Sequence, residues 1–176
     1  MTTITSTRLR HEPRPKFRHI VGAGFDVALH VGSQRGARVV PGGERLCVVV
    51  ADRPDAGTPI ATDLPTSARS SSCVVWCHAD GGVQVRTSWA PPSLLVCRDH
   101  TTMIPETPGQ AGLVRMESGD RLLVLSSAAY EAAAERMVHL LHSAPHRLLA
   151  VDADSILATV FADVPHAGGA VITRLG

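Results

Sequence analysis

Residues 119–131 read Gly-Asp-Arg-Leu-Leu-Val-Leu-Ser-Ser-Ala-Ala-Tyr-Glu, and they change from a strand pattern to a helix pattern within a few positions. The apolar run predicts a buried strand from Arg121 to Ser126, in a hairpin with Gly112 to Met116. A serine followed by an alanine-rich stretch predicts a helix that Pro145 ends. Ser126 and Ser127 stand where a nucleophile could lie, but a capping role fits the pattern better.

The residues on either side of this junction complete an α+β pattern. We expect strands before it, and a second helix with a closing strand after it. The expected strands before it are His19 to His30, Ala37 to Val40, Arg45 to Ala51, Cys73 to His78, Val83 to Ser88 and Leu94 to Arg98. The later helix spans about Arg147 to Ala162, and the last strand runs from Ala170 to Leu175. This order predicts a single domain over residues 19–176.

Composition limits the function classes. The chain has 176 residues, 44% of them hydrophobic and 19% charged, with a formal net charge of +1. Such a balance gives no overall field for nucleic acid or an anionic membrane, and 3% aromatic residues argue against base stacking. Residues 1–18 predict a basic, flexible arm without the apolar stretch of an export signal, so we expect a cytoplasmic protein.

The four cysteines allow two interpretations. Cys47, Cys73, Cys77 and Cys97 could be buried thiols, or the last three could bind zinc with His78. Three residues between Cys73 and Cys77 on a strand would separate the two sulfurs by roughly 13 Å. We therefore favour buried thiols.

Four local patterns carry a family resemblance. Residues 21–27 read Val-Gly-Ala-Gly-Phe-Asp-Val, residues 51–57 Ala-Asp-Arg-Pro-Asp-Ala-Gly, and residues 88–96 Ser-Trp-Ala-Pro-Pro-Ser-Leu-Leu-Val. With residues 119–131, and in this order, they resemble the metal-dependent PPM-type serine/threonine phosphatases. The similar branch is the bacterial, SpoIIE-like group of sporulation and stress-response phosphatases. The resemblance implies a layered αββα sandwich with two antiparallel sheets.

The same resemblance identifies the positions of the metal ligands. The family pattern Val-Gly-Gly-Asp-Phe-Tyr-Asp places Gly24 at an aspartate, and the pattern after the second strand retains Asp52. The second aspartate of the family's Gly-Asp-x-Leu-Leu-Leu-Tyr-Thr-Asp pattern becomes Ser127, and the closing Asp-Asp becomes Gly168 and Gly169. The other matching positions are Gly57, Gly119, Asp120 and Glu131.

These replacements argue against the family's chemistry. Two divalent cations need several oxygen ligands to activate a bridging water, and Asp52 alone cannot hold both ions. We therefore expect an inactive phosphatase-like domain, a pseudophosphatase, with no catalytic residue, metal or cofactor. It would bind a protein, and the resemblance implies a regulator of bacterial sigma factors or stress signalling. Asp52 could equally be the first residue of an Asp-x-Pro turn.

Three alternatives stay open. An active manganese- or magnesium-dependent phosphatase could use a rearranged site of Asp26, Asp52, Asp55 and Glu131. The chain could also be a purely structural homodimer. His139, His142 and His146 recur at helical spacing and could bind a surface metal, although a solvated helix end is the interpretation that we favour.

The chain is short for this family. Only about twenty residues, Asp52 to Ser72, separate two strands where the family carries a long helix pair. We expect one helical layer to be reduced, which would leave a sheet face to be covered by a second copy or by a partner protein.

Overall fold

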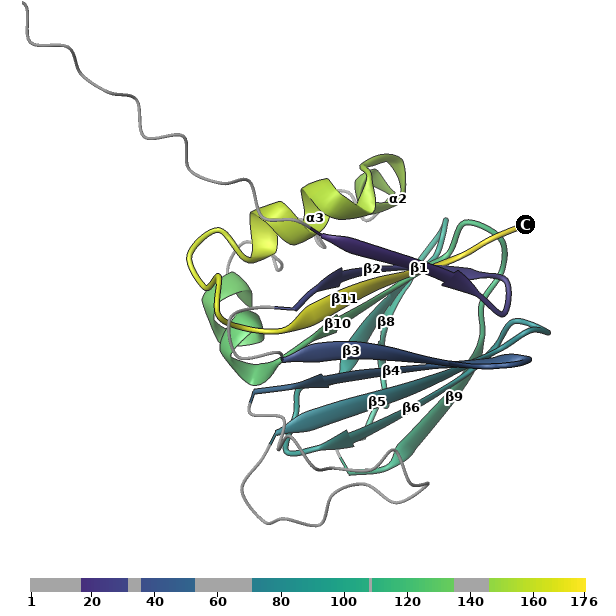
Figure 1. Cartoon of the computed structure of the whole chain (residues 1–176), viewed down its shortest axis with the longest axis horizontal. Helices are drawn as coiled ribbons and strands as arrows, with labels where there is room; N and C mark the ends of the chain where they lie inside the picture. The colour runs from purple at the N-terminus through teal and green to yellow at the C-terminus, as the bar shows by residue number, and fades with distance from the viewer. Residues whose placement is uncertain (1–16, 32–35, 53–70, 108, 135–145) are drawn as a thin grey trace, which may run out of the picture.

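The computed structural model describes residues 17–31, 36–52, 71–107, 109–134 and 146–176. These residues form two antiparallel sheets packed face to face, with helices on one side (Figure 1). The six-stranded sheet has the order β1-β2-β11-β10-β7-β8, and the five-stranded sheet has the order β3-β4-β5-β6-β9. The strands are β1 (Arg18–Gly22), β2 (Phe25–His30), β3 (Ala37–Gly42), β4 (Arg45–Ala51), β5 (Ser72–His78), β6 (Gly82–Ser88), β7 (Ser93–Val96), β8 (Thr101–Ile104), β9 (Ala111–Arg115), β10 (Arg121–Leu125) and β11 (Gly169–Arg174).

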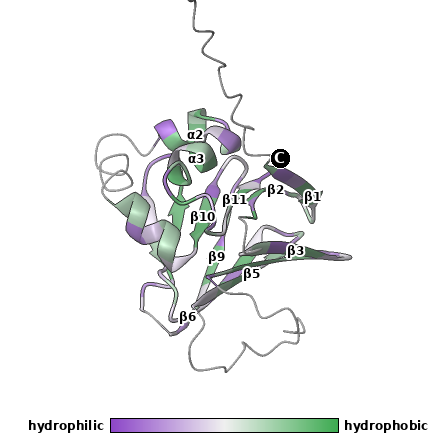
Figure 2. Cartoon of the chain, turned by 60° about the vertical axis from the view of Figure 1, so that its left-hand side comes forward, coloured by the Kyte–Doolittle hydropathy of each residue, from purple (hydrophilic) through white to green (hydrophobic). Residues whose placement is uncertain are grey.

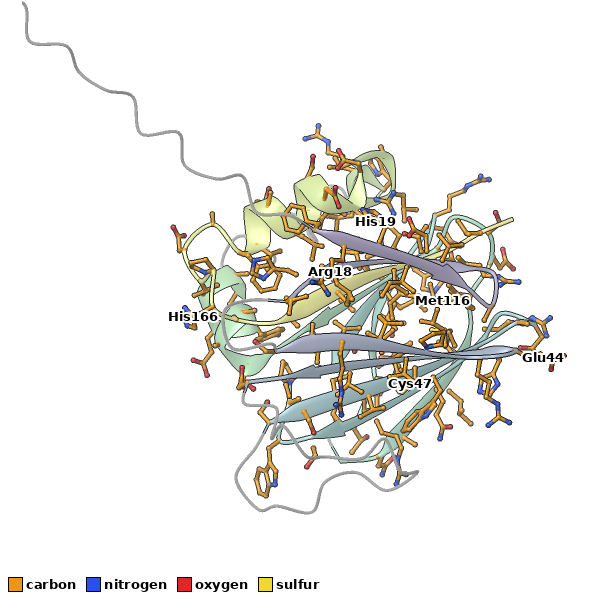
Figure 3. The ribbon with its side chains drawn as sticks, in the orientation of Figure 1. Arg18, His19, Glu44, Cys47, Met116 and His166 are labelled. Carbon is orange, nitrogen blue, oxygen red and sulfur yellow. The ribbon has the colours of Figure 1, made fainter. Side chains whose placement is uncertain are left out.

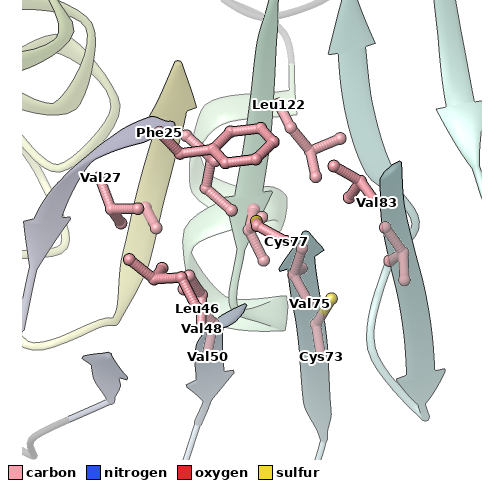
Figure 4. Close-up of a cluster of buried hydrophobic side chains, with 14 of the residues drawn as sticks. Phe25, Val27, Leu46, Val48, Val50, Cys73, Val75, Cys77, Val83 and Leu122 are labelled. Carbon is pink, nitrogen blue, oxygen red and sulfur yellow. The ribbon is translucent and has the colours of Figure 1, made fainter. Parts of the chain in front are cut away.

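The main core lies between the two sheets. Alternate residues of β4 and β5 point inward, so Val48 and Val75 meet Phe25 and Leu122 of the other sheet (Figure 4). Each of these four side chains is fully buried. A strand of period two buries one face by this alternation, which explains why the apolar patterns of the sequence locate the strands correctly.

A second core covers the outer face of the six-stranded sheet. Helix α3 (Ala153–Val160) places Leu157 against Leu123 and Val171, and α2 (Arg147–Ala150) adds Leu148. A helix at residues 127–134 completes this layer with Ala129 and Ala133. Figure 2 shows these described helices on the side of the six-stranded sheet. The layered α+β sandwich expected from the sequence is therefore confirmed.

The five-stranded sheet has no helix on its outer face among the described residues. Residues 53–70, where the sequence predicts the reduced helical layer, lie outside the described residues. Cys47 and Val74 point to that face, yet they are only 8% and 7% exposed. Leu113, on the edge strand β9, is 78% exposed. The exposed apolar surface of this sheet is thus concentrated at its edge and not over its centre.

Three elements differ from the sequence prediction. The expected strand from His19 to His30 is a hairpin, because Ala23 and Gly24 form a turn with φ of 50° and 73°. The expected second helix is divided into α2 and α3, since Asp152 is extended and its carboxylate accepts a hydrogen bond from the Ser155 amide at 2.8 Å. Strand β8 was not predicted.

The start of the described chain bears on the predicted arm of residues 1–18. Arg18 is the first residue of β1, and the Phe17 ring lies 5.9 Å from the ring of His30. These two residues therefore belong to the folded domain. No helix in the described part of the chain has the length and apolar character needed to cross a membrane.

Candidate functional site

One end of the sandwich collects most of the positions that the sequence singled out, and we call it the Asp52 end. Asp52 follows β4, Ser127 follows β10, and Gly168 precedes β11. The Ala128 amide donates to the Asp52 carboxylate at 3.2 Å, and the Ser126 amide donates to the Gly168 carbonyl at 3.1 Å. His166 lies near this end, whereas Glu44 marks the opposite end at the tip of the β3–β4 hairpin (Figure 3).

Asp52 and Ser126 act together at the start of the 127–134 helix. The Ser126 hydroxyl accepts from the Ala129 amide at 3.4 Å, and Asp52 accepts from the Ala128 amide. The first amides of a helix have no partner within the helix, and a carboxylate there also meets the positive end of the helix dipole. The capping role predicted for Ser126 is confirmed, and Asp52 is a second cap provided by the other sheet.

Ser127 is engaged in a hydroxyl pair. Its Oγ lies 2.6 Å from Oγ of Ser71, the residue that precedes β5. The pair joins the strand-to-helix junction of one sheet to the strand start of the other. Ser127 contributes no negative charge at the position where the family places a carboxylate.

Close packing requires glycine at both positions where β11 begins, Gly168 just before the strand and Gly169 as its first residue. A Cβ added to Gly168 would lie 2.3 Å from the carbonyl carbon of Gly36, and the Gly36 carbonyl accepts from the Ala51 amide at 2.7 Å. A Cβ on Gly169 would lie 2.4 Å from the Phe161 ring. The Gly36 backbone and the Phe161 ring therefore occupy the space that side chains would need at these two positions.

Gly24 does not belong to the Asp52 end. It lies in the β1–β2 turn, and Phe25 pairs with Arg174 at the far end of β11 from Gly169. There the Arg174 guanidinium donates to the carbonyls of Gly24 at 2.9 Å and Ala79 at 3.0 Å. The structure thus separates Gly24 from Asp52, Ser127 and Gly168, contrary to the sequence interpretation.

The chain reaches the Asp52 end in the β2–β3 connection instead. That connection reads Val31-Gly32-Ser33-Gln34, which also matches the start of the family pattern Val-Gly-Gly-Asp and places Gln34 at the aspartate. His30 pairs with Gly169, and the Gly36 carbonyl accepts from the Ala51 amide, so both described ends of this connection lie at the Asp52 end. Residues 32–35 lie outside the described residues.

The other matched positions have local roles or lie elsewhere. Gly119 has a φ of 90° in the β9–β10 turn, and the Asp120 carboxylate accepts from the Glu117 amide at 2.8 Å. Glu131 is exposed on the helix. Gly57, Asp55, His139 and His142 lie outside the described residues, and His146 is exposed just before α2.

Asp26, one carboxylate of the alternative site, is not brought to Asp52, and Asp55 of that site lies outside the described residues. Asp26 lies on β2 opposite Thr173, and its carboxylate is bound by His19 Nδ1 at 3.1 Å. The second nitrogen of His19 lies 2.7 Å from Asp154 of α3, and both carboxylates raise the pKa of the imidazole. Figure 3 shows His19 on β1 beside the helices. Asp26 is therefore part of a surface cluster, four residues along β2 from the Asp52 end.

The donor set at the Asp52 end does not fit the pair of divalent cations that the fold family implies. Among the described residues no group of three or more histidine, cysteine, aspartate or glutamate side chains could hold a metal ion, and the Asp52 carboxylate already caps a helix. Magnesium and manganese are held by several oxygen ligands, with carboxylates to balance the charge. A hydroxyl pair and two tightly packed glycines supply neither.

The cysteines are buried free thiols, as predicted. Cys73 and Cys77 point into the core, where Cys73 Sγ lies 3.4 Å from the Ser93 hydroxyl, whereas His78 lies on the opposite face of β5. Burial raises the pKa of both thiols to about 12. Strand alternation thus separates His78 from the cysteines of the proposed zinc set.

His30 is a buried residue near this end that the sequence reasoning missed. Its ring stacks on Phe161 with centroids 4.1 Å apart, and Nδ1 lies 3.0 Å from the Ala167 carbonyl. Burial lowers the pKa of this imidazole, so the neutral form is favoured. A histidine that ends an apolar strand gives no clear sequence signal, because such a residue is equally common in a turn.

Comparison with solved structures identifies the fold. No family model matches the sequence, and no curated protein matches it by sequence. The RsbU and RsbW domains of a Mycobacterium tuberculosis protein align with a TM-score of 0.57 at 16% identity, over 86% of this chain and 60% of that one. The PP2C phosphatase domain of Bacillus subtilis SpoIIE, with a fragment of its regulatory domain, aligns with a TM-score of 0.57 at 10% identity, over 90% and 62%.

RsbX, solved in complex with magnesium, aligns with a TM-score of 0.53 at 8% identity, over 89% of this chain and 98% of that one. This chain therefore spans about 60% of the length of the first two structures and nearly all of RsbX. Identities this low show a shared fold and not a shared activity. The chain has the fold of the PPM-type phosphatases, as its sequence resemblance predicted.

Proposed function

We propose that this chain is a catalytically inactive phosphatase-like domain that works by binding another protein. The observation that carries the proposal is the use of Asp52 as a helix cap, at the point where the family holds its metals. Ser127 is bound to Ser71, and Gly168 is packed on Gly36, so the neighbouring positions serve the fold as well.

The proposed inactivity follows from the lack, among the described residues, of the negative charge that two metal ions would need. Phosphoryl transfer by two metal ions needs carboxylates that hold both cations and a bridging water between them. Without those ligands neither the nucleophile nor the clamp on the phosphate oxygens forms. A fold that keeps its two sheets without this chemistry still presents surfaces through which a regulatory domain could bind a protein.

The partner class that we propose is a protein of bacterial sigma-factor or stress signalling, in the cytoplasm. The support is the sequence resemblance, together with the structural likeness to the RsbU and RsbW domains and to the phosphatase domain of SpoIIE, which is described as a cell fate determinant. No nucleic acid is needed as a partner, since the net charge of +1 provides no general attraction.

Hydrolysis of p-nitrophenyl phosphate and of a phosphoserine peptide, each with added manganese or magnesium, tests inactivity. We expect no turnover above the buffer rate with either substrate. Asp52→Asn is the diagnostic variant, and Asp99→Asn, an exposed aspartate beside His100, is the matched control. Turnover that Asp52→Asn abolishes and Asp99→Asn leaves unchanged would establish an active enzyme and refute the proposal.

The binding half of the proposal needs its own measurement. Cross-linking in the native cell, followed by titration of each purified partner against the full chain, should give saturable binding with no dependence on manganese. If no cross-linked protein binds the purified chain at micromolar concentration, the regulatory role is wrong even when the chain is inactive.

A further inference from the structure

Strand β9 is a free edge of the five-stranded sheet, and its exposed side chains are unusual for an edge. Within the described sheet β9 pairs with β6 alone, and Figure 1 shows it at the border of that sheet. Leu113 is 78% exposed, and Ala111 and Arg115 beside it are exposed too. An apolar edge strand of this kind is a ready template for another strand.

The direction of the β9 backbone groups follows from the ladder with β6. The Met116 amide donates to the Gly81 carbonyl at 2.9 Å, one step beyond the pair Gly82–Arg115. Hydrogen-bonded and non-hydrogen-bonded pairs alternate along an antiparallel ladder. The pairs of Val114 and Gly112 with β6 are therefore hydrogen-bonded, and the amides and carbonyls of Ala111, Leu113 and Arg115 point to the open side.

The open side of β9 has room. A cavity of about 340 Å³ lies between β8 and β9, lined by residues of both strands and of their connection. A Cβ on Gly112 would lie 2.3 Å from Ile104 Cγ2 and 3.1 Å from Pro105 Cα, so the end of β8 packs closely on β9 at Gly112. The cavity also borders Ala111 and Leu113 of β9.

The other described edges carry protection that β9 lacks. Strand β3 contains Pro41, which cannot donate to an incoming strand. His19 on β1 is bound to Asp154 of α3, and β8 has only four residues. Strand β9 contains no proline, no lysine and no acidic residue, and Arg115 is its one charge.

We propose that two copies of this chain associate through antiparallel pairing of β9 with β9, on a two-fold axis at Leu113. Leu113 then faces Leu113 of the partner subunit, and Ala111 faces Arg115 of the partner subunit. The outward groups of each facing pair form two hydrogen bonds. The two five-stranded sheets become one continuous sheet.

The charges of the strand agree with this register. Each Arg115 lies opposite an alanine, so no like charges face each other across the axis. The exposed Leu113 side chains cover one another at the centre, as the hot spot of an isologous interface does. The pairing does not use the Asp52 end, so it is independent of the proposed function.

Sedimentation velocity of the full chain, from about 1 to 300 µM, tests the association. We expect a reversible monomer–dimer equilibrium. Leu113→Pro removes an outward amide that β6 does not use, and it should weaken the dimer at least tenfold while the circular dichroism spectrum is retained. Val21→Pro, at the 69% exposed valine of the β1 edge, is the matched control and should leave the dimer unchanged.

Charge variants at Ala111 test the register. Ala111→Glu faces Arg115 of the partner subunit twice per dimer and should tighten association by roughly 2- to 30-fold, whereas Ala111→Arg should weaken it by a similar factor. Adding Arg115→Glu to Ala111→Arg should restore it. A strict monomer at 300 µM, or Ala111→Glu and Ala111→Arg shifting the equilibrium in the same direction, would overturn the proposal.

Discussion

At the scale of single residues, two histidines give the molecule opposite responses to pH. His19 is held between the carboxylates of Asp154 and Asp26, which raise the pKa of its imidazole. A raised pKa in the folded state contributes stability that is complete below the unfolded value of about 6.5 and is lost as pH rises through the folded value. The side chain is 43% exposed, so the contribution stays below about 1 kcal/mol.

His30 acts in the other direction, because burial lowers the pKa of its imidazole. Below about pH 6.5 the His30 imidazole binds a proton in the unfolded chain but stays neutral in the folded chain. The free energy of unfolding therefore decreases as pH falls towards the folded pKa.

Urea unfolding of wild type, His19→Gln and His30→Gln from pH 5 to 8.5 measures both effects. The stability difference between wild type and His19→Gln should shrink as pH rises. The difference between wild type and His30→Gln should shrink as pH falls. His100→Gln, which removes an exposed pair with Asp99, is the control for a solvent-exposed histidine. Parallel pH profiles for all four proteins would contradict both assignments.

Gly24 is a structural residue of the Arg174 network, and it can be tested as one. Its φ is 73°, and a Cβ would lie 2.1 Å from Arg174 Nη1, which donates to the carbonyls of Ala23 and Gly24. Gly24→Ala should therefore cost about 2–4 kcal/mol, from backbone strain and from displaced charged hydrogen bonds.

Gly43 provides the matched control for that variant. Its φ is 60°, and no atom lies within 4 Å of the added Cβ, so Gly43→Ala should cost only about 1 kcal/mol. Thermal unfolding of the two variants measures the difference. Equal losses of stability in the two variants would show that the Arg174 side chain moves aside without a cost in free energy.

At the scale of elements, the 127–134 helix is started by residues from both sheets. Asp52→Ala removes one of its two side-chain caps and should destabilise the protein by about 0.5–2 kcal/mol. Asp52→Asn keeps an oxygen that accepts the Ala128 amide, so its loss should be smaller. Chemical unfolding with and without manganese measures both variants.

If Asp52 instead still binds a metal ion, we expect a different result for these variants. In that case manganese would stabilise wild type, and Asp52→Asn would lose the stabilisation as fully as Asp52→Ala does.

Sequence patterns predicted most elements, and the exceptions have physical causes. The strand from Val83 to Ser88 was located because one of its faces is buried, which imposes period two on the sequence. The strand from Arg45 to Ala51 was located because it is buried on both faces and is therefore almost continuously apolar. The β1–β2 turn was missed because Ala23 has a φ of 50°, a conformation that alanine rarely takes and no pattern signals. The break between α2 and α3 was not predicted, although Asp152 is a residue type that typically caps a helix start.

The candidate site was predicted in part. The strand-to-helix junction at Ser126 and the closeness of Asp52 to it follow from a continuous local pattern. Gly24 was misassigned because two similar patterns, at Val21 and at Val31, lie ten residues apart. Only the pairing of β2 with β11 tells which of the two lies at the Asp52 end. Topology, and not residue type, carried that information.

At the scale of the whole molecule, the thiols of Cys73, Cys77 and Cys97 report on the opening of the core between the two sheets. Burial raises the pKa of Cys73 and Cys77 to about 12 and that of Cys97 to about 11, so the reactive thiolate is scarce at neutral pH. Ellman's reagent at pH 8 should label none of the four cysteines in the native protein within minutes and all four in 6 M guanidinium.

The rate of labelling then measures the free energy of opening. Cys47 and Cys97, at 8% and 9% exposure, are the first that local fluctuation could reveal. Cysteine-to-serine variants of each residue identify the order in which the four thiols become accessible to the reagent. Rapid labelling of Cys73 or Cys77 in the native state would contradict a closed core.

The contact between Gly36 and Gly168 limits which residues position 168 can accept. An aspartate reinstated at 168 would need its Cβ where the Gly36 backbone already stands, 2.3 Å away, so the β2–β3 connection would have to be rebuilt at the same time. No single substitution at position 168 can therefore introduce a carboxylate without a shift of the Gly36 backbone, whose carbonyl accepts the hydrogen bond from the Ala51 amide.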